Sequence, residues 1–398
     1  MPVSNLKSSL PGEPYYLEAE GPIALITAQI DETLAIQINN HLKEIRMEAM
    51  KQHPSLKNQV GYLRNDYRVE TKLNRLSSGE GQAVIVDSIT GHDIFILTDV
   101  LYTGTSYYNR EEMLTITPDE QYTDLMRTVL ATQNLGQRIN IIMPYLYQGR
   151  KYRHEHQSSM DCAQMLIQLF NLGIANFITF DAHDDRIGNA VPGHNFESFT
   201  TSLQLMQAIL HDYPSLELNS QNLIAVSPNE HTVNRCTYYA NIMKIPVGIF
   251  YKYRSFSPTG LLSETTQYLG TNVEGKDVLI IDDMLVTGRT FLHCIEYLKD
   301  QGARRIIGVA SFAQFTQGIS RIQEAYENGY FDKIYTTNAS YISTNIRSLP
   351  WLSVVDLSKY MARIIDTINH NGSLTGLINP DARIEDLLST HSLEQRLF

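Results

Sequence analysis

Residues 278–290, VLIIDDMLVTGRT, decide the fold class of this chain and locate its chemistry. Their first four positions are apolar and suit a buried parallel strand. The acidic pair Asp282 and Asp283 follows at the end of that strand, where open α/β sheets bind their ligands. The turn after the pair contains Thr287, Gly288, Arg289 and Thr290 and opens a helical pattern, whose first backbone N–H groups can hold a phosphate. The acidic pair suits ribose hydroxyls or hydrated Mg²⁺, so the segment predicts a site for a phosphorylated sugar.

Length and composition favour a two-domain α/β protein. The chain has 398 residues, 43% of them apolar, which is enough to bury two cores. It contains no apolar span of membrane-crossing length and no signal-like N-terminus, so we expect a soluble protein with no membrane partner. Cys162, Cys236 and Cys294 lie in helical patterns without CxxC spacing, which predicts free thiols in a reducing cytoplasm. The formal charge of −11 offers no basic footprint for nucleic acid.

Strand-like apolar runs alternate with amphipathic helical stretches, which is typical of an α/β fold with mainly parallel sheets flanked by helices. We expect strands near residues 22–27, 83–87, 93–97, 140–143, 177–180, 223–226, 247–250, 278–281, 306–310 and 333–336. Residues 169–184 form a helix–Gly–Ala–strand pattern similar to that of residues 298–312, which indicates a duplicated fold. We therefore predict an N-terminal domain over residues 1–195, a C-terminal domain over residues 196–380 and a polar tail over residues 381–398.

The segment 278–290 resembles the signature of the phosphoribosyltransferase-type fold, which phosphoribosyltransferases and ribose-phosphate diphosphokinases share. The diphosphokinase loop usually reads DDMIDTGGT. In this chain Val286 replaces an acid of that loop and Arg289 replaces a glycine. The resemblance implies two tandem phosphoribosyltransferase-type domains. It also implies a set of residues that bind ribose 5-phosphate, namely Asp282, Asp283, Thr287, Gly288, Arg289 and Thr290.

Residues 142–184 carry a second part of the diphosphokinase resemblance. The family has PYxxxxRQDR, then a helix, then a strand that ends in DLHA. Arg150 and Arg153 stand at the places of the family's two arginines, which contact the phosphates of ATP. Guanidinium groups suit this role because they bind phosphate oxygens with two hydrogen bonds. Asp181 and His183 stand at the places of the DLHA aspartate and histidine, so the resemblance implies that His183 is catalytic and binds or orients the Mg²⁺–triphosphate.

The strand-like residues 247–254, VGIFYKYR, end where the family has a KRR run at the base of a flexible loop. Lys252 and Arg254 correspond to the first and third members of that run, and Tyr253 departs at the middle. The resemblance implies that this Lys-x-Arg pair is catalytic.

The stretch Leu-Ile-Ala-Val-Ser-Pro at residues 223–228 resembles the start of the family's VSPDAGG loop, whose aspartate helps to place a metal. Asn229 occupies the place of that aspartate, so the implied metal ligand is a neutral amide oxygen. The two glycines, which let backbone amides approach pyrophosphate, are His231 and Thr232 here.

Residues 75–97 resemble the family segment that binds adenine across a subunit contact. Glu80 matches that segment, whereas Leu76 and Ser78 stand where Phe and an Asp or Asn are usual. The resemblance implies that these three residues bind ATP and that the chain forms a homo-oligomer built on dimers, commonly a hexamer. Residues 47–73 form a polar insertion of unknown use, and the whole resemblance spans about residues 21–380.

Two other local patterns are better explained without a ligand. The residues His154, Glu155 and His156 suggest a metal cluster, but in a polar loop they favour a solvated surface. Residues 270–277, GTNVEGKD, nearly spell a phosphate-binding P-loop. That loop must follow a strand and open a helix, whereas this segment precedes a strand.

The first hypothesis is therefore an enzyme that uses Mg²⁺ and ATP to transfer a diphosphoryl group to ribose 5-phosphate, giving 5-phosphoribosyl 1-diphosphate and AMP for nucleotide biosynthesis. The alternative is a weak or inactive homologue that acts as a ligand-binding or regulatory subunit. The alternative rests on Leu76, Asn229, Tyr253, Val286 and the lost glycines. A base-specific phosphoribosyltransferase is a third hypothesis, but such an enzyme needs neither the residues 142–184 nor the Lys-x-Arg pair.

Overall fold

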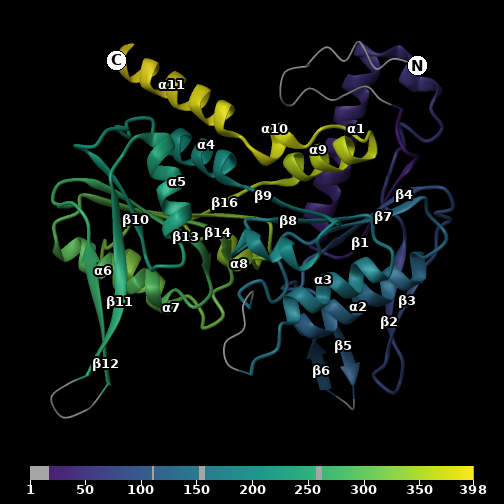
Figure 1. The fold of residues 1–398 in the computed structure, drawn as a ribbon, viewed down its shortest axis with the longest axis horizontal. Coiled ribbons are helices and arrows are strands. Elements are labelled where there is room, and N and C mark those ends of the chain that lie inside the picture. Colours follow the sequence, from purple (N-terminus) through teal and green to yellow (C-terminus); the bar gives the residue numbers. More distant parts are fainter. Residues whose placement is uncertain (1–17, 110–111, 152–156, 257–261, 398) are drawn as a thin grey trace. The chain divides into compact units, whose positions relative to one another are not determined.

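The chain divides into two compact units in a computed structural model (Figure 1). Backbone is described for residues 18–109, 112–151, 157–256 and 262–397, and the side chains of residues 108–109, 252–256, 262–265 and 394–397 are left out of that description. Unit 1 comprises Met1–Thr200 and Leu357–Asn379, and unit 2 comprises Thr201–Asp356 and Pro380–Phe398. Each unit is built on one main sheet of largely parallel strands.

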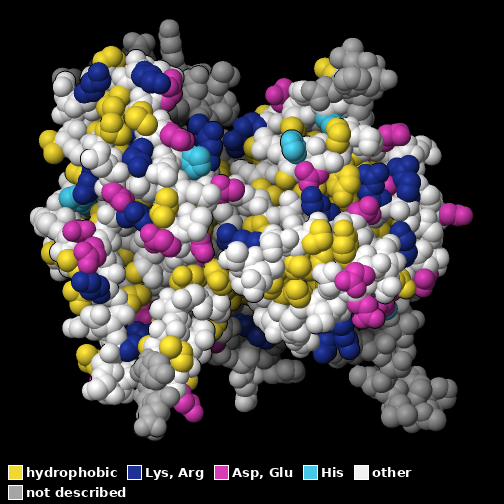
Figure 2. Space-filling view, turned by 180° about the vertical axis from the view of Figure 1, so that it is seen from behind, with side chains coloured by type: hydrophobic (Ala, Val, Ile, Leu, Met, Phe, Trp, Pro, Cys, Tyr) yellow, Lys and Arg dark blue, Asp and Glu magenta, His cyan; other side chains and the backbone are white. Residues whose placement is uncertain are grey.

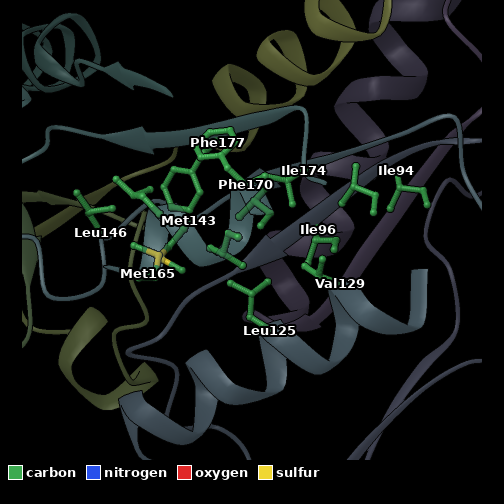
Figure 3. Packing of buried hydrophobic residues seen from close by; sticks show 14 of the residues in the cluster. Ile94, Ile96, Leu125, Val129, Met143, Leu146, Met165, Phe170, Ile174 and Phe177 are labelled. Carbon is green, nitrogen blue, oxygen red and sulfur yellow. The ribbon is translucent and has the colours of Figure 1, made fainter. Parts of the chain in front are cut away.

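Unit 1 contains a five-stranded sheet in which every neighbouring pair is parallel. The strand order is β1 (Ile23–Gln29), β4 (Asp93–Thr98), β7 (Arg138–Ile142), β8 (Asn176–Phe180) and β9 (Asn195–Phe199). The apolar runs of β4, β7 and β8 are buried, as expected for parallel strands covered on both faces. Helices α2 (Pro118–Thr132) and α3 (Asp161–Asn171) supply one core; Figure 3 shows Leu125 and Val129 of α2 beside Ile96 of β4.

Two small antiparallel hairpins belong to unit 1. Strands β2 (Thr71–Arg75) and β3 (Gly81–Ile85) form the first, and β5 (Ser106–Asn109) and β6 (Glu112–Thr115) form the second. Helix α1 (Glu32–Gln52) starts at an Asp31 side chain that accepts a hydrogen bond from the Leu34 backbone N–H. It packs against α9 (Ser358–Asn369), whose Tyr360 ring contacts Phe180 and Phe199 of the sheet edge-on.

Unit 2 contains a seven-stranded sheet. Its order is β12 (Leu262–Leu269), β11 (Val247–Phe256), β10 (Leu223–Ser227), β13 (Asp277–Leu285), β14 (Arg305–Ala313), β15 (Lys333–Thr337) and β16 (Leu352–Val355). Strands β11 and β12 pair antiparallel and the other pairs are parallel. Val278 and Ile280 of β13 pack toward α6 (Arg289–Asp300) and α7 (Ser320–Glu327). Leu279 and Ile281 pack on the opposite face, with α4 (Ser202–Asp212) and α5 (Val233–Met243).

The predicted fold class is confirmed, because each of the ten expected strands overlaps an observed one. The strands that were not expected are β2, β5, β6, β9, β12 and β16. They are short or rich in polar residues, and they lack the long apolar run on which the expectation depended. Strand β2, for instance, alternates between half-buried and exposed positions.

The domain bounds differ from the expected division at residues 195, 196 and 380. The chain passes from unit 1 to unit 2 at Thr200–Thr201, and residues 357–379 belong to unit 1 rather than to the C-terminal domain. The physical reason is a buried ion pair: Arg46 Nε of α1 donates to Asp366 Oδ1 of α9 at 2.8 Å. Nη1 of Arg46 donates to Tyr62 O at 2.8 Å, and Nη2 donates to the side-chain oxygen of Asn369.

The structure adds detail to two further expectations, those for residues 47–73 and 381–398. The region 47–73 is more than a polar insertion, because Leu56, Tyr62 and Tyr67 are buried and Tyr67 N donates to Asn39 Oδ1 at 2.9 Å. Residues 381–398 are not simply a polar tail, because helix α11 (Asp381–Leu397) buries Ile384 against the α4/α5 core and Tyr238 donates to Asp381 at 2.7 Å. None of the helices in the described ranges is both long and apolar enough to cross a membrane.

Candidate active site

The acidic pair lies at the carboxyl end of the buried strand β13, where the sequence places it. Asp282 is 8% exposed and Asp283 is 5% exposed, and the backbone N–H of Asp283 donates to Asp282 Oδ1 at 2.9 Å. Burial and the neighbouring carboxylate of Asp283 raise the pKa of Asp282 well above its ordinary range. A ligand that donates hydroxyl hydrogens to the pair, or a cation beside it, would favour the charged form.

The turn after β13 has the geometry of an anion site at a helix start. Gly288 adopts φ 73°, and a Cβ there would lie 2.6 Å from Cδ1 of Ile322, so a side chain fits neither the backbone nor the space. Gly288 caps the twelve-residue helix α6, and Thr287 Oγ1 accepts a hydrogen bond from Arg289 N at 3.4 Å. Thr290 is half-buried and Arg289 is exposed. The first turn of α6 therefore presents backbone donors and the positive end of the helix dipole.

The loop between β10 and α5 closes on itself around Asn229. Asn229 Oδ1 accepts from His231 N at 2.9 Å and from Thr232 N at 3.2 Å. The hydroxyl of Ser227 donates to Asn229 O at 2.7 Å and lies 2.9 Å from the hydroxyl of Thr232. An amide oxygen has two lone pairs, and both are directed to backbone donors here. In this arrangement Asn229 does not fit the role of a metal ligand.

In unit 1, His183 lies just after the carboxyl end of β8. Asp181 has φ 42°, its N–H donates to Phe199 O at 2.8 Å, and Ala182 N donates to Ser198 Oγ at 3.1 Å. These hydrogen bonds hold the residues that follow β8 against β9. His183 follows and is half-buried, and the next residue, Asp184, accepts from Arg186 N at 2.9 Å.

Arg150 is exposed in the turn that follows the neighbouring strand β7. His183 and Arg150 therefore follow two adjacent strands at one edge of this sheet. Arg153 lies outside the described residues, as do His154, Glu155 and His156.

The three expected adenine-binding residues share the tip of the β2–β3 hairpin. Leu76 is 50% exposed, and the hydroxyl of Ser78 donates to Glu80 Oε2 at 2.6 Å. The tip is anchored to α2, because Arg75 donates twice to Asp124, at 3.0 and 2.6 Å. This bidentate pair gives the hairpin a fixed base while its tip stays exposed to a ligand or to another chain.

Lys252 and Arg254 lie on β11, opposite Thr266 and Glu264 of β12. Their side chains are outside the described part of the structure. Strands β11, β10 and β13 are consecutive in the sheet, and β10 is parallel to both neighbours. Their carboxyl ends therefore lie along one edge, which brings together the Lys-x-Arg strand, the Asn229 loop and the acidic pair.

One charged residue at this edge was missed by sequence reasoning. Arg235, in the first turn of α5, donates from Nη1 to Ser311 Oγ at 3.1 Å, and its charge lowers the pKa of Asp282 against the effects that raise it. In the sequence, a cation three residues after the loop that follows a strand is on its own only a weak indication of a functional residue. Across the described ranges, no group of three or more His, Cys, Asp or Glu side chains could hold a metal ion.

Comparison with known proteins supplies the family. The model of the N-terminal domain of ribose phosphate pyrophosphokinase matches residues 45–173, and the phosphoribosyl transferase domain model matches residues 205–335. A ribose-phosphate pyrophosphokinase of Vibrio parahaemolyticus is 26% identical over 315 residues, 78% of this chain and 91% of that protein. The chain belongs to the ribose-phosphate pyrophosphokinase family. Pyrophosphokinase and diphosphokinase are two names for one class.

Other members of the pyrophosphokinase family show the same relation. The protein of Chromobacterium violaceum is 26% identical over 323 residues, 80% of this chain and 88% of its own length. The crystal structure of phosphoribosylpyrophosphate synthetase from Mycobacterium smegmatis has the same fold, with a TM-score of 0.68 over 88% of this chain and all of that one, at 18% identity. This chain is thus a divergent pyrophosphokinase, which agrees with its changes at Leu76, Asn229 and Val286.

Proposed function

We propose that this pyrophosphokinase transfers the diphosphoryl group of ATP to ribose 5-phosphate. The observation that carries the proposal is the β13–α6 unit, where a buried carboxylate pair adjoins a glycine-capped helix start. The carboxylates of such a unit can accept hydrogen bonds from ribose hydroxyls, and the helix start a few residues later can hold a phosphate. The anomeric hydroxyl attacks the β-phosphorus of ATP, the bond from that phosphorus to the α-phosphate oxygen breaks, and AMP leaves as the hydroxyl proton is lost. The products are 5-phosphoribosyl 1-diphosphate and AMP, which would feed nucleotide biosynthesis.

In unit 2 the roles follow the positions along the sheet edge. The turn with Thr287, Gly288, Arg289 and Thr290 holds the 5-phosphate, and Asp282 and Asp283 accept hydrogen bonds from the ribose hydroxyls. Lys252 and Arg254 of β11 neutralise charge on the transferring group. Such transfer depends mainly on positioning and on stabilising oxygen charge, which a set of fixed cations and backbone donors supplies.

In unit 1 the proposed roles concern ATP. Arg150 and Arg153 contact its phosphates, and the β2–β3 hairpin tip with Leu76, Ser78 and Glu80 contacts its adenine. His183 orients the triphosphate. We place Mg²⁺ in the substrate, as the complex with ATP, because Asn229 is occupied by backbone donors.

The three cysteines are buried, and burial raises the pKa of Cys162 and of Cys236 to about 12. This suits our proposal of a cytoplasmic enzyme, since inert buried thiols need no oxidising compartment. Charged side chains of both signs are interspersed on the face seen in Figure 2, which supports small phosphorylated partners over a nucleic acid.

Release of AMP tests the proposed function. We expect AMP to form from ATP and Mg²⁺ when ribose 5-phosphate is present and to stay near background when it is absent. Chromatographic separation of the nucleotides measures both reactions. Formation of ADP in place of AMP would reveal simple phosphoryl transfer, and no nucleotide product at all would favour a binding subunit.

The Asn229 loop gives a prediction about Mg²⁺ dependence. Asn229→Asp keeps an oxygen for the two backbone donors and adds one negative charge, which hard Mg²⁺ prefers over a neutral amide oxygen. We expect the variant to form AMP faster than the parent at limiting Mg²⁺, and Asn229→Ala, which removes the loop acceptor, to form it more slowly. The measurement is the initial rate over a Mg²⁺ titration. A variant Asn229→Asp that is slower at every Mg²⁺ concentration would show that the neutral amide belongs to a competent pocket.

We also propose that the chain is a homo-oligomer built on dimers, with the hairpin tip completing a nucleotide site of an adjoining subunit. Glu80→Arg reverses a charge beside Ser78 at this exposed tip. We expect the parent to sediment as a dimer or larger, and the variant to lose association or nucleotide affinity. Glu327→Arg, at the exposed end of α7, is the control and should change neither. A fully active monomeric parent would exclude the shared site.

A further inference from the structure

Arg235 occupies a defined place at the carboxyl edge of the unit 2 sheet. It is the third residue of α5, the helix that follows the Asn229 loop and packs against β10 and β13. Its Nη1 donates to Ser311 Oγ at 3.1 Å. Ser311 is one residue beyond Ala310, which is the register partner of Asp282 in the β13–β14 pair. A guanidinium from α5 therefore reaches the strand position next to the acidic pair.

The serine that accepts from that guanidinium belongs to a cluster of buried hydroxyls. The cluster consists of Thr201, Ser311 and Thr337, each at most 1% exposed. The hydroxyls of Thr201 and Ser311 are 3.3 Å apart, and Thr337 Oγ1 donates to Ser311 O at 2.7 Å. These polar side chains lie at the end of a sheet face that is otherwise packed with apolar residues from α4 and α5. Buried hydroxyls are costly without partners, so this cluster gives Ser311 a fixed orientation toward Arg235.

The acidic pair needs a counter-charge. Two buried carboxylates next to each other disfavour the doubly charged form, and burial and Asp283 indeed raise the pKa of Asp282. The charge of Arg235 lowers the pKa of Asp282 and so opposes these effects. A carboxyl group that takes up a proton becomes a donor and loses an acceptor position, which is unsuitable for a sugar hydroxyl that must donate.

We propose that Arg235 is a positioning residue that prepares Asp282 and Asp283 to accept the hydroxyls of ribose 5-phosphate. The inference rests on the proposed function and names one further residue of its ribose site. Arg235 acts through the carboxylates, held by Ser311, and is not itself a contact of the phosphate groups.

The test compares binding of two ligands to the full chain. Arg235→Met is expected to weaken binding of ribose 5-phosphate by about 10- to 100-fold, which is the usual effect of losing a charged hydrogen-bonding partner. Binding of a non-hydrolysable ATP analogue should stay within about twofold, because Arg235 is not among the proposed contacts of ATP. Arg235→Lys restores the charge and should recover most of the affinity. Isothermal titration calorimetry measures each dissociation constant, and circular dichroism checks folding.

The matched control is Arg304→Met. Arg304 forms a bidentate pair with Asp277, at 2.8 and 2.9 Å, and Asp277 begins the same strand β13 at its opposite end. The control removes an arginine from an Arg–Asp pair on that strand and should leave ribose 5-phosphate binding unchanged. If Arg235→Met fails to fold, Ser311→Ala removes the hydroxyl that accepts a hydrogen bond from Arg235 Nη1, and it should still weaken the binding of ribose 5-phosphate selectively.

The outcomes separate the inference from the proposed function. A parent that binds ribose 5-phosphate and releases AMP, with an Arg235→Met variant that binds the sugar phosphate equally well, overturns the inference and leaves the function standing. An Arg235→Met variant that loses affinity equally for both ligands would also overturn the inference, and so would an Arg235→Lys variant that does not recover the affinity. A general structural defect would then explain the result. A parent with no affinity for ribose 5-phosphate refutes the function and the inference together.

Discussion

Substitution of Lys252 by alanine is expected to lower kcat by about 10²–10³-fold, the usual cost of removing one preorganised charge contact in a transition state. Lys252 lies on β11, next to the strand β10 and its Asn229 loop, at the edge that carries the acidic pair. Negative charge shifts onto the oxygens around the β-phosphorus as AMP leaves, so a lysine there acts on the transition state more than on bound ATP.

Steady-state kinetics with both substrates and a direct ATP-binding measurement check this prediction. Lys276→Ala is the matched control: Lys276 is half-buried, its Nζ donates to Ser220 O at 3.2 Å, and it precedes β13 at the opposite end of the strand. The control should keep the parental kcat. A Lys252→Ala variant whose kcat is within about twofold of the parent contradicts the assignment, because the lost contact would then contribute nothing in the transition state.

Replacement of Arg46 by methionine is expected to lower the free energy of unfolding of unit 1 by about 3–5 kcal/mol, since it leaves a buried carboxylate without its partner. Arg46 is fully buried, and Asp366 is 2% exposed. The guanidinium also lies 4.6 Å from the centroid of the Tyr62 ring. Its three hydrogen bonds join α1, the 47–73 region and α9, so the loss affects all three segments.

Chemical denaturation with two probes measures this effect. Circular dichroism reports both units, whereas fluorescence of Trp351, the one tryptophan of the chain, reports unit 2. We expect the transition of unit 1 to shift to lower denaturant and the Trp351 transition to move less. The double variant Arg46→Met with Asp366→Leu removes both charges and should recover part of the loss. An Arg46→Met variant with parental stability would contradict the structural role given to the pair.

The central part of the fold follows from local sequence. Strand β13 is apolar at 278–281 and ends in two acids, and Gly288 is followed by a strongly amphipathic helix, so strand, turn and helix are specified within a few residues. In the structure Gly288 has positive φ, and a Cβ there would lie 2.6 Å from Cδ1 of Ile322, so the predicted turn requires its glycine. The same reasoning identified β8 and β10 from their mainly apolar runs.

The parts that were missed depend on contacts between residues far apart in the chain. Arg46 and Asp366 are separated by 320 positions, and the sequence around one residue gives no indication of the other. The return of residues 357–379 to unit 1 was therefore not expected. Helix α11 has charged and polar residues around most of its surface, which hides the few positions, such as Ile384, that it buries. A local sequence pattern indicates the periodicity of apolar residues, but it does not indicate which distant part of the chain covers a given residue.

The site shows the same contrast. The residues proposed to bind ribose 5-phosphate could be predicted because they are contiguous in the sequence. Arg235 belongs to another element; it donates to the buried Ser311, and its charge lowers the pKa of Asp282. Asn229 was expected as a metal ligand from its position in a motif. Its side chain instead accepts two backbone hydrogen bonds of its own loop, a local preference of asparagine that competes with ligand binding.

The position of the label after reaction with ATP labelled in its β-phosphate tests diphosphoryl transfer most directly. The reaction contains ribose 5-phosphate and Mg²⁺, and anion-exchange chromatography separates the products. We expect the label to move to the ribose as 5-phosphoribosyl 1-diphosphate and the AMP to be unlabelled. Label recovered in ADP, or as free diphosphate without labelled ribose, would contradict this expectation.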